Sequence, residues 1–138
     1  MRLFDDYVHL AMGMPAGTCA TSGSCGAYFV VEADGSVYPC DFYVLDEWKL
    51  GHLGEQPLPA LAKSDRAVRF LQDGLEHPTA CASCRWQSLC FGGCKRDWWE
   101  DASGVRQNYY CPAFQRFFDH AAPRLMQIAR AELQARGR

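Results

Sequence analysis

The chain is organised around the stretch Cys81-Ala-Ser-Cys84-Arg-Trp-Gln-Ser-Leu-Cys90-Phe-Gly-Gly-Cys94, which is followed at a distance by Cys111. These five cysteines are separated by two, five, three and sixteen residues. Loops of two to five residues let several sulfur atoms converge on one point, as a Zn²⁺ ion or an iron–sulfur cluster requires. The other three cysteines, Cys19, Cys25 and Cys40, lie upstream and have to be brought in by folding. Eight thiols supply two sites of four thiolates with none left over.

The bulk composition limits the class of protein. A chain of 138 residues, 22% charged and 49% apolar, is typical of a small globular domain. Its formal net charge of −2 argues against a nucleic-acid partner. No apolar run approaches the roughly 20 residues of a membrane span, so no membrane partner is expected. The start of the chain lacks the apolar core of a signal peptide, so we expect a cytoplasmic protein whose reduced thiols bind metal.

A β-hairpin is predicted upstream of the main cysteine stretch. The β-rich segments 28–33 and 36–38 flank Asp34-Gly35, a dipeptide that favours a two-residue turn. In that register Phe29 faces Cys40, so the hairpin would help to gather the upstream cysteines.

Helices are predicted around this hairpin. Apolar spacing indicates one helix over 3–12 and another over 59–73, and a brief helix is expected within 95–106. A terminal helix begins near Pro112, and Pro123 should kink or split it. Together with irregular cysteine-rich loops, these elements predict a small α+β fold.

Two kinds of metal site compete for the thiols. Structural zinc usually takes two close cysteine pairs, and Cys81 and Cys84 form such a pair, whereas Cys90 and Cys94 have a looser spacing. A [4Fe–4S] cluster binds thiolates at separate corners and tolerates uneven spacing. Gly92-Gly93 allows close backbone approach to such a cluster. The pattern favours clusters over zinc and leaves open which four cysteines belong together.

The whole pattern, Cys-x5-Cys-x14-Cys followed by Cys-x2-Cys-x5-Cys-x3-Cys-x16-Cys, resembles the SPASM domain of radical-SAM enzymes. The segments 34–41, 50–51, 90–94 and 108–111 are most similar to anaerobic sulfatase-maturating enzymes. The resemblance covers almost the whole chain. It implies a connecting helix and loop over 1–18 and a SPASM fold over 19–138.

This resemblance implies two auxiliary [4Fe–4S] clusters, each held by four cysteines. The implied ligands are Cys19, Cys25, Cys40 and Cys94 for cluster I, and Cys81, Cys84, Cys90 and Cys111 for cluster II. The implied role is electron transfer and substrate positioning while a sulfatase cysteine or serine is oxidised to Cα-formylglycine. Asp41 matches the family position proposed to deprotonate the substrate, although a carboxylate after a hairpin can equally cap a turn.

One motif of the family is absent from these 138 residues: the Cys-x3-Cys-x2-Cys that holds the S-adenosylmethionine-binding cluster. We therefore expect S-adenosylmethionine and a third [4Fe–4S] cluster only in a separate radical-SAM barrel, and no catalysis by this chain alone. The implied partners are that barrel in the same polypeptide, an unfolded sulfatase peptide, and an electron carrier such as ferredoxin or flavodoxin.

Other functions remain open at this point. The chain could be a zinc-binding structural module that binds peptide, a freestanding carrier of ferredoxin type, or the SPASM domain of another peptide-modifying radical-SAM enzyme. Iron, sulfide and zinc analysis separates the first from the others. Of the four histidines, only His77 has a spacing that could join a cysteine pair, and a surface or packing role is favoured for each.

Overall fold

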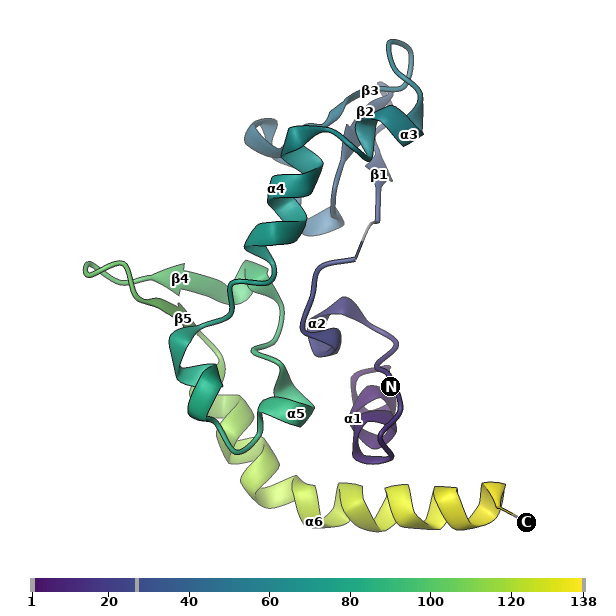
Figure 1. Ribbon diagram of the computed structural model, residues 1–138, viewed down its shortest axis with the longest axis vertical. Coiled ribbons are helices and arrows are strands. Elements are labelled where there is room, and N and C mark those ends of the chain that lie inside the picture. The colour runs from purple at the N-terminus through teal and green to yellow at the C-terminus, as the bar shows by residue number, and fades with distance from the viewer. Residues whose placement is uncertain (1, 27, 138) are drawn as a thin grey trace. The chain divides into compact units, whose positions relative to one another are not determined.

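The computed structural model describes residues 2–26 and 28–137 (Figure 1). The chain divides into two compact units. The first unit comprises Met1–Gly23 and His77–Arg138, and the second comprises Ser24–Glu76. The chain thus leaves the first unit after Gly23 and returns to it at His77, and each unit is described by itself.

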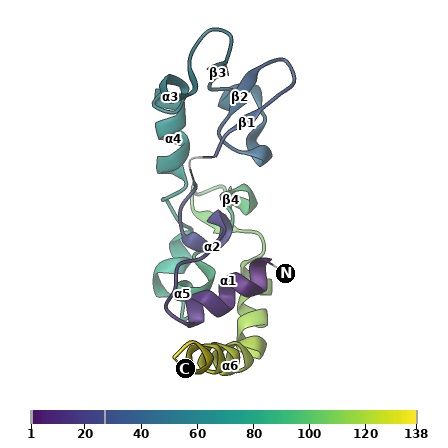
Figure 2. The ribbon, with the colours of Figure 1, turned by 90° about the vertical axis from the view of Figure 1, so that its right-hand side faces the viewer.

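The second unit contains a three-stranded antiparallel sheet, which lies beside α3 (Leu58–Leu61) and α4 (Asp65–Asp73) (Figure 2). Its strands are β1 (Val30–Val31), β2 (Ser36–Tyr38) and β3 (Gly51–His52), in that order. The hairpin between β1 and β2 confirms the expected turn region. Strand β3 was not foreseen, because a two-residue strand beside irregular chain has no alternating pattern to detect.

The expected register of this hairpin is wrong by one residue. Val31 pairs with Val37 and the Glu32 amide donates a hydrogen bond to the Ser36 carbonyl, so three residues (33–35) rather than two connect the paired residues. Gly35 has a φ of +89°, the left-handed conformation that closes a three-residue hairpin loop. Asp34 fixes this loop by accepting hydrogen bonds from the Ser36 amide (2.9 Å) and hydroxyl (2.7 Å). Phe29 is therefore not opposite Cys40 in this register.

Two short helices stand where a single helix was expected over 59–73. They are α3 (Leu58–Leu61) and α4 (Asp65–Asp73). The Ser64 hydroxyl accepts a hydrogen bond from the Ala67 amide (3.3 Å) and so begins a new helix. An unrecognised N-cap therefore explains why the long helix is divided.

The first unit is mostly helical and holds the main cysteine stretch. Its elements are α1 (Arg2–Ala11), α2 (Cys19–Ser22), η3 (Thr79–Ser83), α5 (Gln87–Cys90), η4 (Lys95–Asp97), β4 (Trp98–Glu100), β5 (Arg106–Asn108) and α6 (Cys111–Arg136). Helix α1 confirms the helix expected over 3–12. The short α2 was missed, because four residues among Gly, Ser and Thr carry no periodic signal.

A second hairpin stands where a brief helix was expected around Trp98 and Trp99, and within 95–106 only the short η4 is helical. Strands β4 and β5 pair antiparallel, with Trp98 opposite Asn108. Asp101 builds the connecting turn, because its carboxylate accepts hydrogen bonds from the Ser103 amide (2.9 Å) and the Val105 amide (3.0 Å). Local side chain to backbone bonding of this kind competes with helix formation.

Helices α1 and α6 enclose the apolar core of the first unit. This core contains Tyr7, Leu89, Phe118 and Leu125. The rings of Tyr7 and Phe118 meet edge to face, 4.9 Å apart. Helix α6 carries Pro123 in its interior and is not divided.

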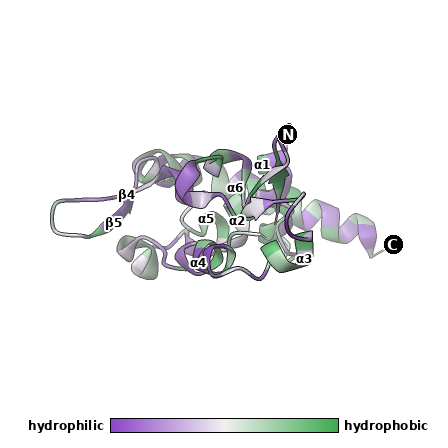
Figure 3. Ribbon diagram, turned by 90° about the horizontal axis from the view of Figure 1, so that it is seen from above, coloured by the Kyte–Doolittle hydropathy of each residue, from purple (hydrophilic) through white to green (hydrophobic). Residues whose placement is uncertain are grey.

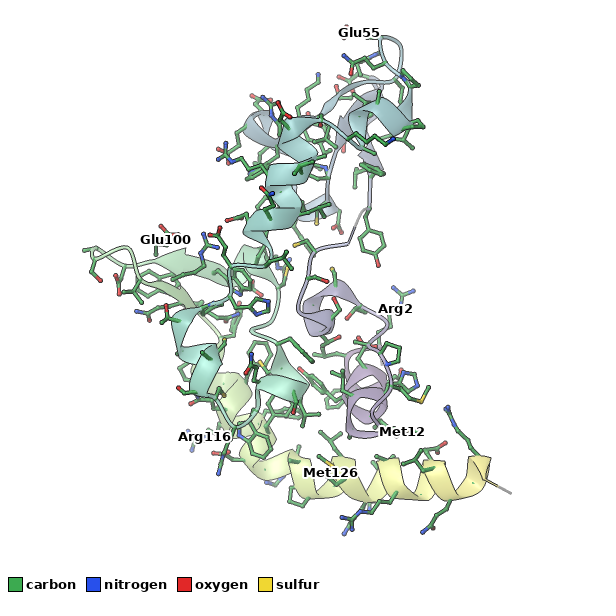
Figure 4. The ribbon with its side chains drawn as sticks, viewed as in Figure 1. Arg2, Met12, Glu55, Glu100, Arg116 and Met126 are labelled. Atoms are coloured by element: carbon green, nitrogen blue, oxygen red, sulfur yellow. The ribbon has the colours of Figure 1, made fainter. Side chains whose placement is uncertain are left out.

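A bend in α6 lies between the labelled residues Arg116 and Met126 (Figure 4). Pro123 falls within this interval, and proline removes one helical hydrogen bond and kinks a helix. The C-terminal turns of α6 are largely hydrophilic (Figure 3). None of the described helices has the length and apolar character that a membrane span needs.

Candidate metal centres

Four cysteines of the first unit line one cavity of about 580 Å³. They come from η3, its C-terminal boundary, the end of α5 and the start of α6: Cys81, Cys84, Cys90 and Cys111. All eight cysteines of the chain are free thiols and are partly buried. The structure thus brings together the four thiols that the resemblance implies for cluster II.

The rest of the cavity wall is mainly apolar and aromatic. It includes Trp86, Trp99, Val105, Phe114 and Phe118. Such a wall keeps water away from a bound metal group and lowers the local dielectric constant. A metal group held here would therefore be partly shielded from water.

The thiols of this cavity influence one another electrostatically. Burial raises the pKa of the Cys90 thiol to about 11; the Gly92 amide opposes this shift, and Cys81, Cys111 and Cys84 add to it. Burial also raises the pKa of Cys111, and the nearby Cys84 contributes. Without metal these thiols hold their protons at neutral pH. Metal binding must displace them, so loading releases protons.

A left-handed loop approaches the Cys81 sulfur closely. Phe91, Gly92 and Gly93 have φ values of 49°, 79° and 69° in succession. A Cβ atom at Gly92 would lie only 3.3 Å from Cys81 Sγ and 3.2 Å from His77 Nδ1. The missing side chain at Gly92 leaves a small space beside the thiol, as a close backbone approach to a bound cluster requires.

His77 has a buried ring nitrogen next to this space. Its Nε2 donates a hydrogen bond to the Gly23 carbonyl at 2.7 Å, and its ring packs against Trp98. Its Nδ1 is buried and has no hydrogen-bond partner. A buried polar atom without a partner is costly and calls for an occupant or partner nearby.

These observations show that the residues fit an iron–sulfur cluster. The cavity carries four thiols and a mainly apolar wall. The space at Gly92 beside Cys81, called here the glycine cradle, lies next to the unpartnered Nδ1 of His77. Cluster thiolates attach at separate corners, so their sulfur atoms gather less tightly than the four ligands of a single metal ion. Among the residues that the structure describes, no three His, Cys, Asp or Glu side chains are grouped closely enough for a single metal ion.

The other four cysteines are divided between the two units. In the first unit Cys19 begins α2 and Cys94 precedes η4. Burial raises the pKa of Cys94; the Arg96 amide opposes this shift, and Asp97 and Cys19 add to it. The Cys19 and Cys94 thiols are therefore within electrostatic reach of each other.

Cys25 and Cys40 belong to the second unit. A Cβ atom at Gly74 would lie 2.7 Å from Cys25 Sγ, so the C-terminal end of α4 approaches this thiol closely. Cys40 donates a hydrogen bond to Asp41 Oδ1 at 3.3 Å. The grouping of these two cysteines with Cys19 and Cys94 stays a prediction.

Asp41 is exposed at the start of the short helix η1 (Asp41–Tyr43). The last residue of η1, Tyr43, packs edge to face against Phe70 and Trp48, with ring separations of 5.1 and 6.0 Å. This aromatic contact anchors η1 to the second unit and leaves the Asp41 carboxylate accessible. The catalytic role of Asp41 stays a prediction.

Comparison with known proteins identifies similar sequences. Residues 23–85 match the SPASM family model, described as an iron-sulfur cluster-binding domain. The chain is 40% identical over 131 residues to a cysteine-type anaerobic sulfatase-maturating enzyme of Clostridium perfringens, covering 94% of this chain and 35% of that protein. It is 31% identical over 136 residues to a serine-type enzyme of Bacteroides thetaiotaomicron, covering 96% and 33%.

Solved structures of similar proteins share the fold of this chain. The structure described as native anSMEcpe with bound AdoMet matches with a TM-score of 0.84 and 38% identity, over 94% of this chain and 35% of that one. Native anSMEcpe with bound AdoMet and Cp18Cys peptide also matches, with a TM-score of 0.85 and 38% identity, over 94% and 36%. The chain spans about a third of the length of these relatives. The expected small α+β fold is confirmed.

Proposed function

We propose that this chain is the auxiliary-cluster part of an anaerobic sulfatase-maturating enzyme, because residues 23–85 match the SPASM iron–sulfur cluster-binding domain and 131 residues are 40% identical to such an enzyme. The observation that carries this proposal is the apolar cavity lined by four thiols. Similarity to both cysteine-type and serine-type sulfatase-maturating enzymes over at least 94% of the chain supports the assignment.

The proposed domain covers residues 19–138 and holds two [4Fe–4S] clusters, while residues 1–18 connect it to the rest of the enzyme. Cluster II takes the four thiols of the cavity. Cluster I takes the remaining four: Cys19, Cys25, Cys40 and Cys94. Four thiolates on each cluster leave no iron corner for substrate, so the roles of the domain are electron transfer and positioning.

Clusters of this kind supply sites for one-electron transfer when bound. The protein contributes the thiol ligands, the close backbone at Gly92 and the apolar wall that excludes water. Asp41 contributes an accessible carboxylate on an anchored turn. We propose that it accepts the proton of a substrate thiol or hydroxyl during oxidation to Cα-formylglycine.

The partners of the proposed domain follow from this role. A radical-SAM barrel in the same polypeptide would bring S-adenosylmethionine and a third cluster. An unfolded sulfatase peptide is the proposed substrate, and a ferredoxin or flavodoxin the proposed electron partner. Eight free thiols suit a reducing compartment, so the proposed location is the cytoplasm.

Anaerobic purification followed by iron, sulfide and zinc analysis tests this proposal. We expect about eight iron and eight sulfide ions per chain, with a brown absorption near 400 nm. About two zinc ions per chain without sulfide would overturn it in favour of a structural zinc module. Replacing Cys84 by Ala should remove about half of the iron, and a full iron count in that variant would contradict the ligand assignment.

A further inference from the structure

Asp6 lies on α1, faces the interior of the first unit and is only 4% exposed. Its carboxylate accepts three hydrogen bonds from the loop that leads into α2. The donors are the Gly17 amide (2.8 Å), the Thr18 hydroxyl (2.6 Å) and the Thr21 hydroxyl (2.7 Å). One buried side chain thus fixes both ends of a short turn.

That turn carries Cys19. Thr18 directly precedes the cysteine, and Thr21 follows it by two residues. Helix α2 has only four residues, and a helix this short is not stable by itself. The Thr18 side chain does not cap α2, because its hydroxyl is directed to Asp6 and Thr21. The position of Cys19 therefore depends on Asp6.

The contact is close and the carboxylate is ionised. A Cβ atom at Gly17 would lie 3.0 Å from Asp6 Oδ1, so the absence of a side chain there permits the approach. Burial raises the pKa of Asp6, but the hydrogen bonds from Thr18, Thr21 and Gly17 outweigh it and bring the pKa below its usual value. Asp6 thus places a negative charge inside the unit at neutral pH.

We propose that Asp6 is a positioning residue for the iron ligand Cys19, and that its charge lowers the reduction potential of the cluster which Cys19 binds. This inference rests on the proposed function, since it takes Cys19 as a cluster ligand. Cys19 is within electrostatic reach of Cys94, the other ligand that the first unit gives to cluster I. A nearby negative charge opposes the addition of an electron.

The test compares Asp6→Asn with Asp5→Asn in the cluster-loaded protein. Asp5 is the neighbouring, exposed residue of α1, so its variant removes the same charge from the surface. We expect Asp6→Asn to raise the reduction potential of one of the two clusters and to change its EPR spectrum, and Asp5→Asn to change neither. In air the 400 nm absorption should bleach roughly tenfold faster in Asp6→Asn than in Asp5→Asn.

Two further variants separate the ways in which the proposal can fail. Thr21→Val keeps the charge but removes one hydroxyl donor, and we expect faster bleaching with a smaller change of potential. Cys19→Ala should lose about half of the iron. A full iron count in Cys19→Ala would overturn the ligand assignment itself. Loss of iron in Cys19→Ala, with identical potentials, spectra and bleaching rates in Asp6→Asn and Asp5→Asn, would overturn the role of Asp6 alone.

Discussion

Asn108 donates a hydrogen bond from Nδ2 to the Gly92 carbonyl oxygen at 2.7 Å. Its Oδ1 accepts a hydrogen bond from the Tyr110 amide at 2.6 Å, next to the start of α6 at Cys111. Asn108 is only 7% exposed. This one amide therefore connects the glycine cradle of the cavity to the helix that carries the last cysteine.

Replacing Asn108 by Ala should destabilise the protein and its cluster. The change leaves the Tyr110 amide without its partner, a loss of about 1–3 kcal/mol. We expect a lower melting temperature and faster iron loss. Gln134→Ala is the control, because Gln134 carries an exposed amide on α6 and does not line the cavity. Equal iron retention in both variants would show that Asn108 does not support the site.

Gly92→Ala should weaken cluster binding beyond the cost of backbone strain. Gly104 is a matched control, because its φ of +80° is close to the +79° of Gly92, yet a Cβ atom there meets nothing within 4 Å. Strain alone costs about 1 kcal/mol at either site. A Cβ atom at Gly92 also crowds Cys81 and His77. We expect iron loss in Gly92→Ala only, measured by iron analysis after reconstitution; full iron in both variants would contradict the close approach.

The buried Tyr7 phenol should lower the free energy of unfolding at alkaline pH. Burial, helped by Cys90 and Asp6, raises the pKa of the Tyr7 phenol to about 12. In the unfolded chain the phenol loses its proton near pH 10, while the folded state keeps it until about pH 12. Stability is therefore fully present below about pH 10 and falls as the pH rises above it, by about 3 kcal/mol at most.

The measurement is the free energy of unfolding of the wild type and Tyr7→Phe between about pH 8 and pH 11. The Phe variant keeps the ring that packs against Phe118 and removes the ionising group. The difference between the two proteins should be constant up to about pH 10 and then change in favour of the variant. Parallel curves over the whole range would show that Tyr7 is not the cause.

Asp41→Asn should reduce formylglycine formation in a full-length enzyme that contains this domain. The amide cannot take up a proton, and the loss of a general base typically costs a factor of about 10²–10⁴. The iron content should stay unchanged. Asp46→Asn, at an exposed carboxylate of the following short helix η2 (Asp46–Trp48), is the control. Equal turnover in both variants would return Asp41 to a structural role.

The cysteine pattern indicated that several thiols lie together, and the assignment of these thiols to clusters stays a prediction. Cys81, Cys84, Cys90 and Cys111 line one cavity, although the spacing of the residues alone left their grouping open and the resemblance supplied it. The pair Gly92-Gly93 indicated that the backbone can approach a site closely, and in the structure the backbone at Gly92 lies close to the Cys81 sulfur.

The remaining differences arise from hydrogen bonds that hydrophobic periodicity does not report. Ser64 caps a new helix, and Asp101 holds the turn of a hairpin where a helix was expected. Asp34 and Gly35 close a three-residue loop. The roles of Asp6 and Asn108 were missed for the same reason. A buried polar residue that bonds to distant backbone has no sequence signature of its own.

The divided first unit imposes an order on biosynthesis. Tyr7 belongs to α1, and its packing partner Phe118 is translated roughly a hundred residues later, after the whole second unit. Translation proceeds at about 5–20 residues per second, so α6 is synthesised on the order of 5–20 seconds after α1. Until then the apolar side of α1 lacks its packing partner. The hydrogen bond between His77 and Gly23 joins the points where the chain leaves and re-enters this unit. Ser24–Glu76 is therefore synthesised before the core partners of α1, and the four thiols of the cavity are present together only once Cys111 has been made.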